Sequence, residues 1–154
     1  MKKIIILLIT LTVATKLCSQ AIFIGPTIHY NFGSEKRYFS YGIEASVWVN
    51  DQIDVMFSNP FPPYGFDLGY EWSKGEKYIY SEFQIGVPEI GTSHGIVMQW
   101  TNETPKKFGY QGSVWCAFFV GADARIRIFK DEKIFAPGIF AKVPVCYNNK
   151  PFFW

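Results

Sequence analysis

The stretch YGFDLGYEWS, residues 64–73, alternates between two kinds of side chain without interruption. One set of alternate positions holds only aromatic and aliphatic residues, and the other holds glycine, serine and acidic residues. Successive side chains of a β-strand point to opposite faces, so this stretch predicts a strand with an apolar face and a face of small and acidic residues. The fold depends on which of these faces meets water.

The same alternation recurs along the chain and predicts an all-β protein. It appears in residues 22–33, 38–50, 78–87, 94–100 and 135–145, and no segment shows a helical period. Residues 108–128 keep their apolar side chains on one parity throughout, which favours one long bent strand. The alternative is a break at residues 120–123.

Three short connections predict antiparallel hairpins. The turns are Lys74-Gly75, where glycine is expected to supply a positive φ, Ser34-Glu35, and the segment 102–107. Each turn places apolar residues opposite apolar residues, in pairs such as Tyr70 with Ile79, Tyr30 with Phe39, and Met98 with Tyr110. Consecutive hairpins of this kind indicate an up-and-down meander.

The number of strands depends on residues 50–63, where Ile53, Val55 and Phe57 alternate before a run of prolines. Counting a short strand there gives eight strands, and leaving it as a loop gives seven. Closed single-chain barrels of bacterial membranes have even strand numbers, so we expect eight.

The first residues have the features of a secretory signal. Lys2 and Lys3 precede an apolar run at 4–14, and Ser19-Gln20-Ala21 has the small residues of a cleavage site. The apolar run of about 11 residues is shorter than the roughly 20 that a spanning helix needs. We therefore expect a signal peptide at 1–21 and one exported domain at 22–154.

Composition narrows the functional classes. The formal net charge of the 154 residues is only +2, which gives no support for nucleic-acid binding. Aromatic residues make up 19% of the chain, and charged residues 18%, below the roughly 25% of soluble domains. After the leader no apolar run is long enough for a helix, so insertion into a membrane would have to use strands.

The glycine-rich face of the strands is better suited to a narrow lumen than to a wet surface, because glycine weakens a solvent-exposed strand. The apolar face is then expected to meet lipid, and most lysines fall at turns or strand ends. Trp48, Trp115 and Phe119 would crowd the lumen. Aromatic residues expected at the membrane interface are Tyr30, Phe32, Tyr64, Trp72 and Trp100.

With its export signal, alternating strands, tight turns, charged lumen and C-terminal PFFW, the chain resembles the small outer-membrane β-barrels of Gram-negative bacteria. The resemblance covers residues 22–154 and implies an antiparallel up-and-down transmembrane barrel in the cell outer membrane. It also implies that lipid of this membrane and the barrel assembly machinery are partners, since a terminal aromatic residue helps that machinery recognise the last strand. Here CYNNKP separates the terminal aromatics from the last alternating segment.

The expected lumen holds a set of charged residues that can neutralise one another. In the Lys74-Gly75 register Asp67 lies opposite Glu82, which suggests either an acid/base pair or part of a salt-bridged plug. Buried charges need partners, so we favour the plug, with arginines crossing the lumen. Its expected members are Glu44, Asp67, Glu71, Glu82, Asp123, Arg125, Arg127 and Lys142.

The candidates for catalysis are weak. His29 faces Ser40 in the first hairpin, which suggests a lipid-acting hydrolase, but Glu44 is too far along the strand to complete a triad. His94, beside Ser93, is expected to be an exposed polar residue of a loop. The scattered histidines and cysteines do not form a metal-ligand set, and no cofactor motif is present.

Cys116 and Cys146 remain after cleavage of the leader. A last hairpin that pairs Ile126 with Pro137 puts Lys142 inside, near Asp123, and the two cysteines on opposite faces, without a disulfide. A register shifted by one residue would pair the cysteines but turn the lysine outward. We therefore expect free thiols.

The sequence thus predicts a small outer-membrane barrel with a plugged polar lumen and a structural, surface-interaction or envelope role. Eight strands leave no aqueous channel, so a general pore is not expected. The alternatives are a soluble periplasmic barrel or sandwich that binds an apolar ligand, and a lipid-acting outer-membrane enzyme.

Overall fold

The computed structural model describes residues 21–34, 36–49, 63–87, 89–101, 105–117 and 120–146. Residues 1–20 of the expected signal peptide, the additional strand expected around residues 53–57, Phe119 and the C-terminal PFFW lie outside the described residues. No helix within these ranges is long and apolar enough to cross a membrane. The strands are β1 (Ala21–Phe32), β2 (Arg37–Val49), β3 (Tyr64–Trp72), β4 (Glu76–Val87), β5 (Ile90–Thr101), β6 (Lys107–Ala117), β7 (Val120–Ile128), β8 (Lys133–Ala141) and β9 (Val143–Cys146).

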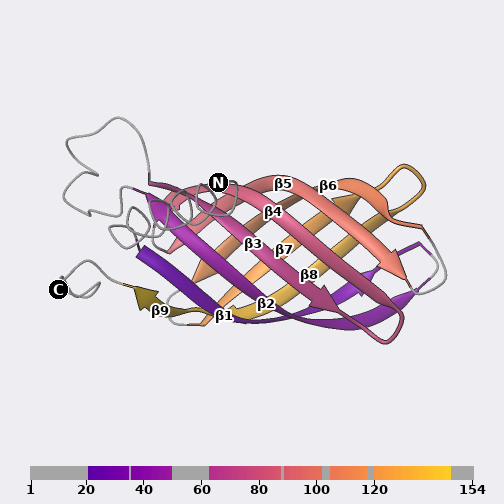
Figure 1. Cartoon of the computed structure of the whole chain (residues 1–154), viewed down its shortest axis with the longest axis horizontal. Helices are drawn as coiled ribbons and strands as arrows, with labels where there is room; N and C mark the ends of the chain where they lie inside the picture. The colour runs from indigo at the N-terminus through magenta and orange to yellow at the C-terminus, as the bar shows by residue number, and fades with distance from the viewer. Residues whose placement is uncertain are drawn as a thin grey trace, which may run out of the picture.

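The strands form a closed antiparallel barrel of eight strands (Figure 1). Each strand from β2 to β8 pairs with the next along the chain, and β1 pairs with both β2 and β8, which closes the ring. The short β9 follows β8 after an interruption at Lys142 and also pairs with β1. The predicted fold class, an up-and-down barrel, is confirmed.

The long strand predicted over residues 108–128 is wrong. The chain turns back between Ala117 and Val120, so this stretch forms β6 and β7, which pair along their length from Tyr110–Ile128 to Ala117–Gly121. This additional hairpin supplies the eighth strand. The number eight is therefore correct, but for a different reason from the one proposed from the sequence.

Two predicted hairpin registers are confirmed, and two are wrong by two residues. The first two hairpins pair Tyr30 with Phe39 and Tyr70 with Ile79, as expected. Met98 pairs with Phe108 instead of Tyr110. Ile126 pairs with Phe135 instead of Pro137. A shift of two residues keeps every side chain on its predicted face, because the side-chain period of a strand is two.

The turn of the second hairpin differs from expectation in its backbone. Ser73 N donates to Glu76 O over 2.8 Å, so Lys74 and Gly75 form the tip. The φ of Gly75 lies outside the left-handed region, and an added Cβ would contact nothing within 4 Å. The expected positive φ is therefore not adopted.

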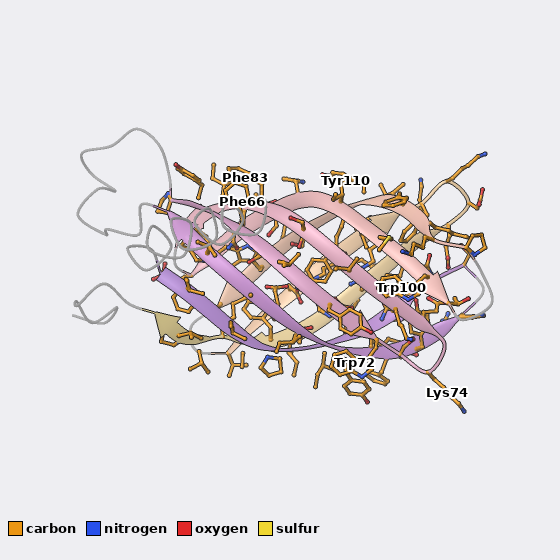
Figure 2. All side chains as sticks on the ribbon, viewed as in Figure 1. Phe66, Trp72, Lys74, Phe83, Trp100 and Tyr110 are labelled. Atoms are coloured by element: carbon orange, nitrogen blue, oxygen red, sulfur yellow. The ribbon has the colours of Figure 1, made fainter. Side chains whose placement is uncertain are left out.

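Polar and apolar residues occupy opposite faces of the barrel wall. The buried residues of the described strands are mostly polar or charged, while many large apolar side chains are exposed, among them Phe108 at 71% and Ile96 at 67%. Figure 2 shows Phe66, Phe83 and Tyr110 projecting from the outside of the ribbon. The predicted assignment of the glycine-rich and acidic face to the lumen and of the aromatic face to the exterior is confirmed.

The joint between the first and last strands has fewer backbone pairs than the others. β1 forms twelve residue pairs with β2 but only four with β8 and three with β9. Pro26 in β1 and Pro137 in β8 lie at this joint, and proline has no N–H to donate to a ladder. The ring therefore closes through a joint in which proline has removed hydrogen bonds.

The connections alternate between the two ends of the barrel. We call the end that carries the β1–β2, β3–β4, β5–β6 and β7–β8 connections the turn end, which is on the right in Figure 1. The β2–β3, β4–β5 and β6–β7 connections lie at the opposite end.

Candidate functional site

Two arginines of β7 occupy the lumen. Arg125 and Arg127 are two residues apart, so both side chains point inward, and their exposed fractions are 3% and 0%. A buried charge is costly unless it is paired and hydrogen-bonded. The arrangement of the lumen is therefore organised by the partners of these two side chains.

Arg125 contacts carboxylates from three strands. Its Nη2 lies 2.7 Å from Glu44 Oε2, its Nε 2.5 Å from Asp123 Oδ2, and its Nη1 3.3 Å from Glu71 Oε1. The guanidinium also lies 4.7 Å from the centre of the Tyr80 ring. One cation thus joins β2, β3 and β7 through the lumen.

Arg127 has a second set of partners, closer to the turn end. Its Nη2 donates to Glu71 Oε1 over 2.7 Å, its Nη1 to Asn31 Oδ1 over 3.1 Å, and its Nε to Gln111 Oε1 over 2.7 Å. Its guanidinium lies 4.4 Å from the centre of the Tyr78 ring. Glu71 is shared by both arginines, which links the two sets of contacts.

Lys142 enters the lumen from the interruption between β8 and β9. Its Nζ lies 2.6 Å from Glu44 Oε1 and 3.4 Å from Asp67 Oδ1, and it donates to Ser46 Oγ over 2.5 Å. The lysine is therefore inside, as the sequence predicted. Its carboxylate partners are on β2 and β3, whereas the sequence suggested Asp123.

Asp67 and Glu82 lie directly opposite each other in the β3–β4 register, as predicted. Asp67 accepts from Gln84 Nε2 over 3.1 Å and lies within ion-pair distance of Lys142. Glu82 makes no ion pair with any described residue, and its Oε1 is buried without a hydrogen-bond partner. No hydrogen bond joins the two carboxyl groups in the described part of the chain, so the geometry does not form an acid/base pair.

His29 and Ser40 are opposite each other in the register but do not form a nucleophile and base. His29 Nε2 lies 3.0 Å from Asp123 Oδ1, and its Nδ1 is 3.3 Å from Glu71 Oε1 without hydrogen-bond geometry. Ser40 Oγ instead donates to Glu71 Oε2 and accepts from Asn31 Nδ2, each over 2.8 Å. Both side chains are fully buried. The hydrolase arrangement is therefore not assembled in this structure.

Polar side chains of β1, β2, β3, β6 and β7, together with Lys142, form one network, which we call the lumen network. An eight-stranded barrel is just wide enough for side chains to fill its interior. No group of three or more histidine, cysteine or acidic side chains among the described residues is arranged to hold a metal ion. The members of the lumen network are His29, Asn31, Ser40, Glu44, Ser46, Asp67, Glu71, Gln111, Asp123, Arg125, Arg127 and Lys142.

A second polar cluster lies nearer the turn end and was not predicted. Glu76 Oε2 accepts from Tyr38 OH and Tyr78 OH, each over 2.5 Å, and from Gln99 Nε2 over 2.9 Å. The two tyrosine hydroxyls also contact each other. The inward parity of Tyr78 was visible in the sequence, but nothing there indicated that an acid from the strand end folds back over the tyrosines.

Apolar side chains close the lumen beside this cluster. These side chains form one buried, packed cluster. Its residues are Tyr78, Tyr80, Val97, Phe129 and Ile134. Beyond them, at the mouth of the turn end, lies a cavity of about 330 Å³ lined by charged and polar residues of several strands and turns. Its lining residues are Ser34, Lys36, Glu76, Gln99, Thr101, Lys107, Asp131 and Glu132.

The opposite end of the lumen holds two tryptophans. Trp48 of β2 and Trp115 of β6 meet edge to face, with ring centres 5.8 Å apart and an interplanar angle of 81°. The sequence predicted that these rings would crowd the lumen. The structure accommodates them by packing one against the other across the barrel.

The aromatic residues predicted for the membrane interface lie near the strand ends. Trp72 and Trp100 lie toward the turn end (Figure 2), and Tyr30 and Phe32 precede the first turn, with ring centres 4.7 Å apart. Tyr64 begins β3, so it lies toward the opposite end. Their interfacial role stays a prediction.

His94 is not in a loop, as the sequence suggested, but in β5 on the outward face. Tyr110 OH lies 2.5 Å from His94 Nδ1, and Thr92 Oγ1 lies 3.1 Å from Nε2. Among the described strand residues, His94 is the only histidine, acid or base that faces outward away from the turn end. Tyr110 itself lies along the middle part of the barrel (Figure 2). The hydroxyls of Thr92 and Tyr110 thus give both ring nitrogens of His94 a hydrogen-bond partner within an apolar surface.

Cys116 is an exposed free cysteine on the outward face of β6, as predicted. Cys146 ends β9, where its backbone pairs with Ile22, and its side chain lies outside the described residues. β6 and β9 are not neighbours in the ring.

Comparisons with known proteins identify the fold but no family. No protein-family model matches the chain, and no curated protein matches it. Among solved structures, a designed transmembrane β-barrel superposes with a TM-score of 0.53 at 12% identity, covering 81% of this chain and 97% of that one. The designed barrel TMB2.3 gives 0.53 at 7% identity, covering 81% and 96%. Ail, the attachment invasion locus protein of Yersinia pestis, gives 0.36 at 12% identity, covering 80% and 95%.

Proposed function

We propose that this chain is a small β-barrel of the cell outer membrane that has a structural, surface-interaction or envelope role and does not act as a pore. The observation that carries the proposal is the lumen network. Arg125 and Arg127 reach from β7 to carboxylates of β2 and β3, and so occupy the space that a channel would need.

The outward face supports a location in a membrane. The exposed side chains of the described strands are predominantly large and apolar around the whole ring. A monomeric soluble protein rarely exposes apolar patches larger than a few hundred Å². A closed barrel also satisfies its backbone hydrogen bonds internally, which a strand protein in hydrocarbon requires.

Three successive layers of side chains support the absence of a pore. The apolar cluster around Tyr78 and Phe129 lies toward the turn end, the lumen network lies next to it, and the edge-to-face pair of Trp48 and Trp115 lies toward the opposite end. A porin instead has a larger ring of strands and a water-filled interior.

The two alternatives receive less support from the geometry. A soluble carrier of apolar ligands would place its apolar residues inside, whereas the lumen here is lined by charges. A lipid-acting enzyme would need a nucleophile that a substrate can reach, but Ser40 is buried and donates to Glu71. The proposal therefore includes no catalytic step. Its partners are outer-membrane lipid and, during insertion, the barrel assembly machinery, with no role for nucleic acid.

The first test is the mobility of the protein on a denaturing gel, with and without boiling, after extraction of the outer-membrane fraction with detergent. We expect the unboiled band to migrate faster and to occur only in that fraction. A single band from protein that is soluble in the periplasm would overturn the membrane assignment.

The second test addresses the sealed lumen. In liposomes loaded with small sugars, the purified protein should leave the swelling rate at the level of empty liposomes. A porin of known activity provides the positive control. Rapid swelling with the wild-type protein would contradict a plugged barrel, even if the gel showed a membrane barrel.

A further inference from the structure

Every connection at the turn end carries a lysine. These residues belong to four different turns, and all four side chains are exposed: Lys36, Lys74, Lys106 and Lys130. Figure 2 shows Lys74 extending from the tip of the β3–β4 turn. The turns thus place one cation at each of four positions around the rim.

A second group of cations faces outward just below the turns. In three hairpins, a base on the outward face of one strand lies directly opposite an apolar residue on the outward face of its partner. The Arg37 guanidinium lies 5.8 Å from the centre of the Phe32 ring. The three pairs are Phe32 with Arg37, Trp72 with Lys77, and Ile128 with Lys133.

The described acids of the turn end, Glu76, Asp131 and Glu132, are fewer than these seven cations. None of the seven cations forms an ion pair among the residues that the structure describes, in contrast to Lys142, Arg125 and Arg127 in the lumen. Of the acids at this end, Glu76 is already engaged by two tyrosine hydroxyls. Among the described residues, the turn end therefore carries an excess of positive charge.

Among the residues that the structure describes, the opposite end has no comparable group of bases. Within the described residues it carries the exposed Glu89, and its lysine, Lys142, points into the lumen. The described bases are thus distributed unequally along the barrel axis. Such an asymmetry has a physical consequence in a bilayer, where charged headgroups lie only at the two surfaces.

We propose that the turn end binds the phosphate groups of anionic lipids in the leaflet that it reaches. This inference rests on the proposed membrane location. Arg37, Lys77 and Lys133 occupy the last outward positions of their hairpins, where an alkyl stem lies along apolar surface and the charged head reaches the headgroup layer. Guanidinium and ammonium groups are the usual protein ligands of phosphate. The rim lysines extend the same positive surface beyond the strand ends.

The proposal makes a quantitative prediction about lipid contacts. The full mature protein is reconstituted in phosphatidylcholine vesicles, and the association of spin-labelled phosphatidylglycerol and spin-labelled phosphatidylcholine with the barrel is compared by electron paramagnetic resonance. We expect a preference for phosphatidylglycerol of roughly fivefold at low salt, as expected for basic side chains near a membrane surface. At 1 M salt the preference should fall toward one, because surface charges are then screened.

Substitutions distinguish an effect of the outward-facing bases from an effect of the protein's net charge. The triple variant Arg37→Gln, Lys77→Gln, Lys133→Gln should reduce the preference to less than about twofold. Lys77→Gln and Lys107→Gln provide a matched pair, since both remove one charge at the turn end. Lys77 faces outward, whereas Lys107 faces inward and lines the mouth cavity. Only the first should lower the lipid preference.

Each outcome has a distinct meaning. A barrel that inserts and shows the same preference in the triple variant would overturn the inference and leave the proposed function intact. Failure of the wild-type protein to insert would instead contradict the proposed function. If the preference vanished equally in Lys77→Gln and Lys107→Gln, net charge rather than this surface would be responsible. Binding of inorganic pyrophosphate to the detergent-solubilised barrel, lost in the triple variant, with no lipid preference, would identify a soluble anion as the ligand and overturn the proposal.

Discussion

Arg125 in β7 donates a hydrogen bond of 2.7 Å to Glu44 in β2, across the lumen, between strands that are not neighbours in the ring. Backbone pairing joins each strand only to its two neighbours. The contact between these two side chains instead joins opposite parts of the wall. The lumen network thus contributes connections that the sheet itself does not provide, and we expect substitutions of its members to reduce stability.

Arg125→Met is expected to destabilise the barrel by about 3–5 kcal/mol, because it leaves buried carboxylates of Glu44 and Asp123 without this cation. The free energy of unfolding can be measured by urea titration in detergent, followed by tryptophan fluorescence. Lys106→Met, at an exposed turn position, is the control and should change stability by no more than about 0.5 kcal/mol. Equal effects of the two substitutions would show that the cross-lumen contacts contribute little.

Glu71→Gln and Glu82→Gln remove the same charge from adjacent strands, but with different expected results. Glu71 accepts hydrogen bonds from Arg127 and Ser40, so its substitution should cost about 2–3 kcal/mol. Glu82 makes no ion pair among the described residues and its Oε1 is buried without a hydrogen-bond partner, so neutralising this buried group breaks no ion pair. Glu82→Gln should therefore leave the urea midpoint unchanged or raise it. A larger loss of stability in Glu82→Gln than in Glu71→Gln would contradict the assigned contacts.

Gly69→Ala tests the close packing of the lumen against the wall. A Cβ at this position would lie 2.0 Å from Tyr80 Cζ, so the ring would have to leave its place. Tyr80 would then lose its 2.6 Å hydrogen bond to Glu44. We expect a loss of about 2–3 kcal/mol in the same titration. Gly75→Ala is the matched control, since its Cβ meets no atom within 4 Å, and it should be tolerated.

Tyr110→Phe removes the hydroxyl that contacts His94 Nδ1 on the outward face. Because a hydrocarbon environment offers no replacement partner, the expected cost is about 1–2 kcal/mol in lipid vesicles. Tyr41→Phe removes a hydroxyl from another exposed outward tyrosine for which the described structure contains no hydrogen bond, and should be nearly neutral. A similar loss in both variants would indicate an effect of the phenol itself and not of the histidine contact.

The faces of the strands were predictable because a single period of two runs through nearly every segment. Asp67 and Glu71 were assigned to the lumen, and Phe66 and Trp72 to the exterior, from alternation alone, and burial agrees at each of these positions. Registers were predictable where the turn was tight, as at Lys74-Gly75. Where connections were longer, parity fixed the face but left the register free to shift by two residues.

The hairpin between β6 and β7 could not be detected by alternation. The pair Ala117–Gly121 leaves three residues, 118 to 120, between its members. When a connection has an odd number of residues, the outward side chains of both strands have residue numbers of the same parity. Here these are the even-numbered residues. The sequence therefore continues its pattern through the turn, and one long strand and two paired strands look identical.

The partners within the lumen were only partly predictable. Alternation places Arg125 and Glu44 inside, but it does not indicate how far around the ring and along the axis each side chain reaches. Contacts between strands that are not neighbours depend on the shear of the closed barrel. For the same reason the inward parity of Tyr78 was visible in the sequence, but its contacts with Tyr38 and Glu76 were not. The outward histidine was missed because its two hydroxyl partners lie on its own strand and on the next.

The joint that contains Pro26 and Pro137 is expected to separate before any other pair of described strands. A closed barrel is expected to open between the two strands that share the fewest backbone pairs. Among the described strands, these are the first and the last. Loss of the backbone pairs between the first and last strands turns the barrel into a single curved sheet. All remaining ladders of that sheet join consecutive strands. The closed ring and the open sheet thus differ by one line of contacts, and the amides along this line should be the first in the wall to exchange their hydrogens with the solvent.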